Sequence, residues 1–323
     1  MSESPLLSRP PTEERNPASH DLDELDSLAL LRRINAEDRT VADAVATALP
    51  ALAEVVDEAS RRLRSGGRVQ YFGAGTSGRL AVLDAVELAP TYSLEPGRFI
   101  AHQAGGNAAL TTSIEGAEDR HEDGVDAATA VAAGDVCIGL AASGATPYVH
   151  GAMIAARRAG AYTALVSANP AAPIAADVDI HVLVPTGPEV VAGSTRMKAG
   201  TAQKLVLNAF STAVMVRLGK TYSNLMVDVA ASNDKLRRRL LTILAEATGQ
   251  PAAHCRTALA AADGDLKVAL VMLLAEADVA TASAALAAGD GVVRAALTRI
   301  DDPKTPPGAV PDGTTQAAQE ENR

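Results

Sequence analysis

The chain has 323 residues, of which 47% are hydrophobic and only 2% aromatic, and its formal net charge is −10. The acidic balance argues against nucleic-acid binding, which depends on basic patches, so an anionic ligand must be held by local amides, hydroxyls and a few cations. Cys137 and Cys255 have no CxxC spacing and the six histidines have no metal-ligand spacing. We therefore expect reduced thiols, no metal and no other cofactor.

The N-terminal part divides into an arm and a helical region. Residues 1–20 are polar and rich in proline, which is typical of a flexible arm. Residues 22–64 keep a helical spacing of leucines and valines. The chain opens with no basic-then-apolar leader and contains no run of 18 apolar residues, so we expect a cytoplasmic protein that does not interact with a membrane.

Five short apolar runs alternate with helical patterns through the middle of the chain. The runs lie at residues 68–72, 98–101, 136–140, 163–167 and 180–184. They lack polar alternation, as expected for strands that are buried on both faces. Strands that alternate with helices predict an α/β fold in which helices flank a parallel sheet. Ligands of such folds bind beyond the carboxyl ends of the strands.

Two turns that combine glycine with hydroxyl residues follow the first and third of these runs, at residues 73–79 and 142–147. A glycine-containing turn before a helix suits an anion, because free N–H groups and the helix dipole face the ligand. Such turns also occur for packing reasons alone. The candidate phosphate-binding residues are Thr76, Ser77, Ser143, Gly144 and Thr146. Two turns of this kind favour a small phosphorylated ligand.

A dinucleotide is the alternative ligand for the first turn, because Gly73, Gly75 and Gly78 fit the spacing of the dinucleotide fingerprint. That fingerprint requires an acidic residue about 20 positions on, at the end of the next strand, to hold the ribose. The next predicted strand instead ends in His102 and Gln103. A sugar phosphate is therefore the better interpretation.

The segment 187–198 follows the last predicted strand and precedes a long helix that is predicted to end near residue 218. Ser194 or Thr195 can cap this helix, which places Arg196 and Lys198 in its first turn. The helix dipole disfavours cations at that end. Both residues are therefore candidate anion contacts, with solvated surface charges as the alternative.

From residue 237 onward the pattern is helical, with breaks at 249–251, 263–265 and 288–291. The short pieces between the breaks predict a small helical module over residues 237–300, which leaves residues 21–236 for the α/β domain. Residues 301–323 are rich in proline and are expected to form a disordered tail.

Several motifs resemble those of the N-acetylmuramic acid 6-phosphate etherase family. They lie at residues 73–79, 115–118, 141–148, 193–208 and 224–228, within a resemblance that extends from about residue 12 to 300. The resemblance implies a sugar isomerase (SIS) domain, usually in a homodimer, followed by a helical module similar to ubiquitin-associated domains. It also implies a sugar-phosphate substrate of cell wall recycling. The lactyl ether of that substrate is eliminated and the product hydrated to N-acetylglucosamine 6-phosphate and D-lactate, which is a carbon–oxygen lyase reaction.

By the same resemblance Glu87 and Glu118 are the two functional acids. One carboxylate must remove the C2 proton of the open-chain sugar, while a carboxylic acid protonates the departing lactate oxygen at C3. We assign Glu87 as the acid and Glu118 as the base, and the reverse assignment stays open. Two positions depart from the family pattern, because Val86 stands where a serine is usual and Ala145 where an arginine is usual.

Glu87 lies ten residues beyond Ser77, roughly 15 Å along a helix, which exceeds the span of a hexose phosphate. Glu87 is therefore expected to serve a ligand that is held by other loops or by a neighbouring subunit. Two other functions remain as alternatives. A non-catalytic sugar-phosphate sensor, like the glucokinase regulatory protein, would need neither acid, and an aldose–ketose isomerase would need only the base.

Overall fold

The computed structural model describes residues 10–229 and 234–301. They fall into two compact units, which are described separately. One unit comprises the residues up to Leu88 together with Glu95–Val214, and the other comprises Ala89–Leu94 together with the residues from Met215 onward. Of the tail expected at residues 301–323, only Asp301 is described, as the last residue of a helix, and the first nine residues of the expected arm also lie outside the described residues.

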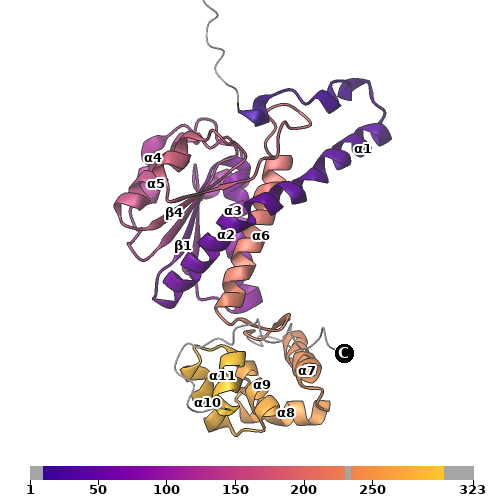
Figure 1. Cartoon of the computed structure of the whole chain (residues 1–323), viewed down its shortest axis with the longest axis vertical. Helices are drawn as coiled ribbons and strands as arrows, with labels where there is room; N and C mark the ends of the chain where they lie inside the picture. Colours follow the sequence, from indigo (N-terminus) through magenta and orange to yellow (C-terminus); the bar gives the residue numbers. More distant parts are fainter. Residues whose placement is uncertain (1–9, 230–233, 302–323) are drawn as a thin grey trace, which may run out of the picture. The chain divides into compact units, whose positions relative to one another are not determined.

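The first unit is built on a five-stranded parallel sheet with the strand order β2-β1-β3-β4-β5 (Figure 1). Register pairs Gly73 with both Gln103 and Leu140, so the carboxyl ends of the three adjacent strands meet at one edge. All five predicted strands are confirmed to within two residues at each end. The strands are β1 (Val69–Gly73), β2 (Phe99–Gln103), β3 (Val136–Leu140), β4 (Tyr162–Ser167) and β5 (Ile180–Leu183).

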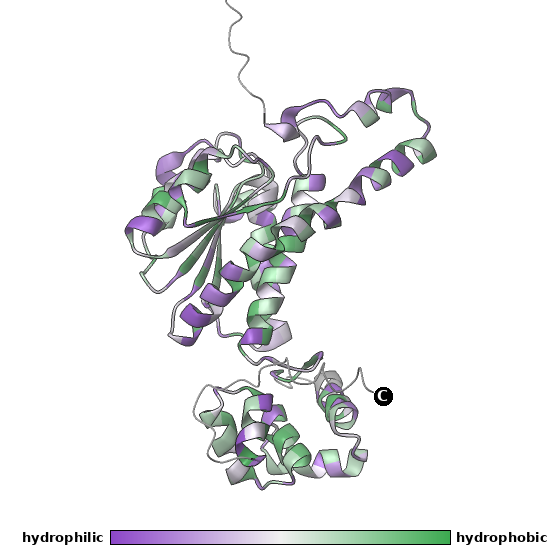
Figure 2. Cartoon of the chain, viewed as in Figure 1, coloured by the Kyte–Doolittle hydropathy of each residue, from purple (hydrophilic) through white to green (hydrophobic). Residues whose placement is uncertain are grey.

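Helices cover both faces of this sheet (Figure 1). On one face α5 (Pro147–Arg158) packs on β3 and β4, and α4 (His121–Ala127) packs on α5. On the other face α2 (Thr40–Arg64) and α6 (Lys198–Arg217) contribute Leu52, Val55 and Phe210 to a cluster with strand residues. Figure 2 shows hydrophobic and hydrophilic residues on different sides of α2, as its buried positions require. The unit also contains α1 (Ser27–Asp38) and α3 (Gly75–Tyr92). The last residues of α3, from Ala89 onward, belong to the second unit.

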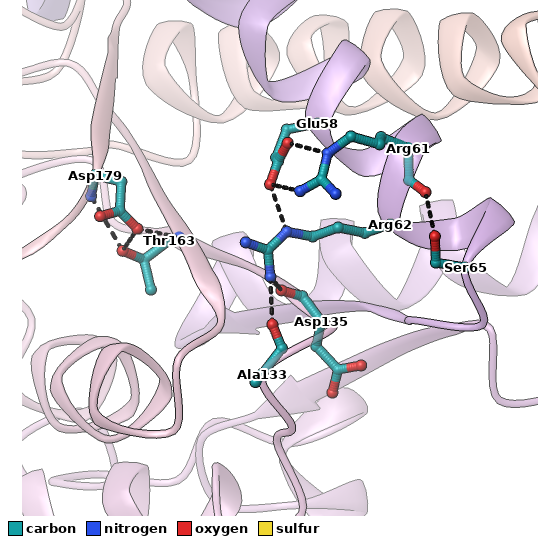
Figure 3. Close-up of polar contacts among 8 residues, drawn as sticks. All are labelled: Glu58, Arg61, Arg62, Ser65, Ala133, Asp135, Thr163 and Asp179. Atoms are coloured by element: carbon teal, nitrogen blue, oxygen red, sulfur yellow. Dashed lines mark hydrogen bonds and ion pairs between the residues drawn. The ribbon is translucent and has the colours of Figure 1, made fainter.

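The amino-end edge of the sheet is closed by polar contacts (Figure 3). Glu58 binds Arg61 and Arg62, and Arg62 also donates to the backbone oxygens of Ala133 and Asp135. Thr163 Oγ1 donates to Asp179 at 2.8 Å. These contacts join α2 to the loop before β3, and β4 to the loop before β5.

Residues 10–20 are packed rather than free, which differs from the flexible arm expected there. Thr12 is buried within a short 3-10 turn, and Asn16, also buried, caps the next one by accepting from Ala18 N–H. Gly193 N–H donates to Thr12 O at 2.9 Å, and Ser19 Oγ donates to Val190 O at 2.8 Å. The N-terminal segment is thereby attached to the loop that precedes α6.

The second unit is a helical module entered through a short hairpin of β6 (Thr221–Tyr222) and β7 (Leu225–Met226). Leu240, Leu244 and Leu270 fill its core, and Val227, directly after the hairpin, packs with them. This packing explains why the unit begins at Met215 rather than after residue 236, where the sequence analysis placed the boundary. The helices are α7 (Asp234–Thr248), α8 (Ala252–Ala261), α9 (Leu266–Ala275), α10 (Val279–Ala288) and α11 (Val293–Asp301).

Three breaks of the helical module coincide with the predicted ones at residues 249–251, 263–265 and 288–291, whereas the break between α9 and α10 at residues 276–278 was not predicted. Asp265 caps α9 by accepting from Val268 N–H at 3.0 Å, and Asp278 caps α10 by accepting from Thr281 N–H at 2.8 Å. Within the described residues no single helix is long and apolar enough to cross a membrane. Together, α9 and α10 have the length and apolar composition of a membrane span, but they are bent by 109° relative to each other. Several of their side chains fill the core of the module.

Candidate active site

The carboxyl-end edge of the sheet carries a cavity of about 560 Å³, which we call the main cavity. Its walls bring together the two glycine-containing turns, the loop before α4, the loop before α6 and one residue of the N-terminal segment. Thr76 and Ser77 reach it from the start of α3, and Ser143 and Thr146 from the turn before α5. The full lining is Glu13, residues 74–77, 118–119, 142–143, 145–147 and 193–196.

The hydroxyls predicted to bind phosphate therefore do converge. Two helices begin at the main cavity, and their first N–H groups and dipoles favour an anion between them. Asn169, which is buried, donates from Nδ2 to Ser143 O at 2.8 Å and holds the second turn in place. Sequence reasoning did not identify Asn169, because nothing local distinguishes it from other loop asparagines.

Gly144 does not line the main cavity, although it was predicted to bind phosphate. Its N–H donates to Ala141 O at 3.0 Å, and its carbonyl accepts from Ile174 N–H at 3.1 Å. Its φ is +67°, and a Cβ would lie 2.2 Å from Ala172 Cβ. The glycine is thus required by the shape and packing of the turn.

The first turn shows the same division between packing and binding. A Cβ on Gly73 would lie 2.7 Å from Gly78 N, and a Cβ on Gly78 would lie 1.9 Å from Gln103 Oε1. These glycines let α3 start close against β1 and β2. Gly75, with φ +54°, makes the reversal and lines the main cavity itself.

Glu118 lines the main cavity with its neighbour Asp119. Its carbonyl accepts from Tyr148 N–H at 3.0 Å, which binds the loop before α4 to the start of α5. Helices α4 and α5 approach closely because a Cβ on Gly124 would lie 1.9 Å from Tyr148 O and one on Gly151 2.1 Å from His121 O. Two glycines therefore help to set where Glu118 stands.

Glu87 does not line the main cavity, so a single chain does not bring the two predicted acids together there. It is exposed near the C-terminal end of α3, and its neighbour Val86 lines a separate cavity. One turn earlier, Asp84 is buried and accepts from Tyr71 Oη at 3.0 Å and Ser211 Oγ at 2.9 Å. Burial raises the pKa of Asp84 despite these hydrogen bonds. The cluster links β1, α3 and α6, and so fixes the helix that carries Glu87.

The two cations predicted to contact an anion have different surroundings. Arg196 is exposed and lines the main cavity. Lys198 is buried, and its Nζ binds Glu37 Oε2 at 2.7 Å. Lys198 is thus committed to a structural ion pair and does not line the main cavity.

The predicted cap of α6 is also corrected. The helix begins at Lys198, and the fully buried Glu189 accepts from Lys198 N–H at 2.9 Å and from Ala199 N–H at 3.0 Å. Ser194 and Thr195 line the main cavity instead. Burial raises the pKa of Glu189, although the two backbone hydrogen bonds act in the opposite direction.

Glu13 is a cavity residue that sequence reasoning missed. Its carboxylate reaches the main cavity from the N-terminal segment, and a Cβ on Gly193 would lie only 2.8 Å from Glu13 Oε2. The lack of a side chain at Gly193 therefore leaves room for this carboxylate. The only signal lay in tertiary pairing between Thr12 and Gly193, which a local pattern does not reveal.

Comparisons with known proteins place the chain among named relatives. The family model for the glucokinase regulatory protein N-terminal SIS domain matches residues 51–157. N-acetylmuramic acid 6-phosphate etherase of Thermobifida fusca is 59% identical over 83% of this chain and 88% of its own length. The etherase of Cutibacterium acnes is 52% identical over 88% and 95%, respectively. A solved phosphoheptose isomerase from Francisella tularensis has a TM-score of 0.43 at 17% identity, over 57% of this chain and 97% of its own.

Proposed function

The chain belongs to the N-acetylmuramic acid 6-phosphate etherase family, and from this premise we propose that it cleaves the D-lactyl ether of N-acetylmuramic acid 6-phosphate. The proposed products are N-acetylglucosamine 6-phosphate and D-lactate, so the protein is a carbon–oxygen lyase of cell wall recycling. The observation that carries the proposal is the convergence of the four hydroxyl residues and Glu118 on one cavity. A sensor would need the hydroxyls but not the acid.

Phosphate is bound between the two helix starts. Thr76, Ser77, Ser143 and Thr146 donate hydrogen bonds, and Arg196 supplies a positive charge. This local set compensates for the acidic net charge of the chain. Because the phosphate stays bound through the whole reaction, these contacts act mainly on substrate affinity.

The chemistry takes place at C2 and C3, which are one and two carbons from the aldehyde carbon C1. Glu118 removes the C2 proton, the C2–H electrons form a C2–C3 double bond, and the C3–O bond breaks with its electron pair on the lactate oxygen. Glu87 protonates that oxygen. Water then adds, with hydroxide to C3 and a proton to C2. The reaction requires one carboxyl group that is ionised, to take the C2 proton, and one that is protonated, to give a proton to the lactate oxygen.

A homodimer supplies the second acid in this proposal. Glu87 of one chain does not line that chain's main cavity, and the same surface of α3 exposes Leu83 by 45% and Val86 by 63%. Exposed apolar side chains beside a functional acid favour burial against a second copy. The proposed reaction takes place in the cytoplasm, where the free thiols of Cys137 and Cys255 stay reduced.

Release of D-lactate from N-acetylmuramic acid 6-phosphate by the purified protein tests the proposal. Stoichiometric D-lactate and N-acetylglucosamine 6-phosphate are expected. Tight binding of the sugar phosphate without lactate release would instead support the sensor, and formation of a ketose would support the isomerase.

A further inference from the structure

A smaller cavity of about 280 Å³ adjoins the main cavity and shares Ala74, Gly75 and Glu118 with it. Its other walls include Arg79, Gln103 and the loop of residues 113–117. We call it the side cavity. Glu118 is the shared residue with an ionisable side chain, so the proposed base stands where the two cavities meet.

Arg79 is the cation of the side cavity. It lies on α3 shortly after Thr76 and Ser77, and is held by backbone oxygens: Nε donates to Leu110 O at 3.2 Å, with a longer contact of 3.5 Å from Nη2 to Thr112 O. No carboxylate of the described residues lies within 4.0 Å of its guanidinium nitrogens. A guanidinium has five N–H donors, so donors remain for a ligand.

We propose that the side cavity binds the carboxylate of the lactyl group through Arg79. This inference rests on the proposed function. The substrate has a phosphate at C6 and a carboxylate on the ether substituent at C3. The C3–O bond that breaks lies between these two anions, and the proton that is removed is on the adjacent carbon C2. Hydroxyls in the main cavity and a guanidinium in the side cavity match that order, with Glu118 between them.

The chemistry of the carboxylate selects an arginine. A guanidinium can donate two parallel hydrogen bonds to a carboxylate, which adds geometric selectivity to the charge. Arg79 would thus distinguish a lactyl-bearing sugar phosphate from one without it, and would hold lactate while its ether oxygen gains negative charge. It is a binding and specificity-determining residue, distinct from the acids that move protons.

Arg79→Gln tests the assignment through two ligands. The KM for N-acetylmuramic acid 6-phosphate should rise by about 10- to 100-fold, as expected for loss of a charge-assisted pair. The Kd for N-acetylglucosamine 6-phosphate, which lacks the lactyl group, should stay within about twofold of wild type. Arg79→Lys keeps the charge but loses the planar pair of donors, so its KM for N-acetylmuramic acid 6-phosphate should lie between those of the wild type and Arg79→Gln.

Arg120→Gln is the matched control, because Arg120 pairs with Asp123 on the surface and lines neither cavity. It should leave both constants unchanged. If Arg79→Gln weakened the binding of both ligands equally, the inference would be overturned. Arg79 would then contact a group that both sugars share, or would serve only the fold. Unchanged constants for both ligands would overturn it as well. If the wild-type protein released no lactate, that result would instead contradict the proposed function.

Discussion

Lys198 Nζ lies 2.7 Å from Glu37 Oε2, an oxygen that also accepts from Asn16 Nδ2 at 2.8 Å. The side chain of Lys198 is 4% exposed and that of Glu37 18%. Burial alone would raise the pKa of Glu37, but hydrogen bonds from Lys198 and Asn16 outweigh it and hold the pKa below its usual value. This contact joins the N-terminal segment, α1 and the start of α6 beside the main cavity.

Lys198→Met should therefore lower stability without removing a phosphate contact. We expect a loss of about 2 kcal/mol in urea unfolding at neutral pH, between values for exposed and buried pairs. A lowered pKa stabilises the fold above the unfolded pKa and this contribution fades as pH falls, so the loss should shrink below about pH 4. Arg196→Gln is the counterpart and should raise KM with little effect on unfolding. If Lys198→Met raised KM without lowering stability, Lys198 would be a ligand contact instead.

Glu189 gives a pH dependence of opposite sign. Burial raises its pKa above the unfolded value of 4.5, so its contribution to stability is full below that pH and declines as pH rises toward the folded pKa. Gln has no such ionisation, although it loses one of the two caps on α6. The stability penalty of Glu189→Gln, measured by urea unfolding, should thus be larger at pH 4.5 than at pH 7. A penalty that grows with pH would contradict this account.

Ser143 and Gly144 are neighbours with different tasks. Ser143→Ala should raise KM about 10-fold through loss of a hydrogen bond to the phosphate, with kcat changing less. Gly144→Ala should instead lower stability by at least about 2 kcal/mol, because φ is +67° and the new methyl would overlap Ala172. Steady-state kinetics and thermal unfolding of both variants separate the two roles. An unchanged KM for Ser143→Ala would remove it from the phosphate site.

Glu87 and Glu118 divide the proton transfers. Each change to Gln should lower kcat by about 10²- to 10⁴-fold. Glu118→Gln should also abolish exchange of the C2 proton with solvent deuterium, whereas Glu87→Gln should keep this exchange while lactate release fails. NMR of the sugar in D₂O distinguishes them. Exchange of the C2 proton that persists in Glu118→Gln and is lost in Glu87→Gln would reverse the assignment. Wild-type rates in both variants would show that neither residue carries a proton in the reaction.

Much of the fold follows from local patterns. The apolar run that predicts β1 follows Gly67 and Arg68 and ends at Gly73, and the run that predicts β3 begins directly after Asp135, so these boundaries are marked by glycine or charge. The two turns of the site are equally local, because glycine and hydroxyls stand together after a strand. The sequence could therefore bring Thr76, Ser77, Ser143 and Thr146 to one edge of the sheet, where they line the main cavity.

Several of the differences concern partners far away in the chain. Lys198 has its partner 161 positions earlier, and Gly144 owes its identity to Ala172 rather than to a ligand. Glu13 reaches the site only because Thr12 pairs with Gly193. Rules based on the spacing of residues along the sequence cannot predict these contacts. Arg79 lies within the first motif, but the ligand that we propose for it depends on the side cavity, which forms only in the folded chain.

The most direct test of elimination and hydration is the reaction of the wild-type protein with N-acetylmuramic acid 6-phosphate in H₂¹⁸O, followed by mass spectrometry of both products. Cleavage of the C3–O bond leaves the ether oxygen on lactate and places solvent oxygen on C3. We expect D-lactate without ¹⁸O and N-acetylglucosamine 6-phosphate with ¹⁸O at C3. Lactate that carries solvent oxygen, or no lactate at all, would contradict it.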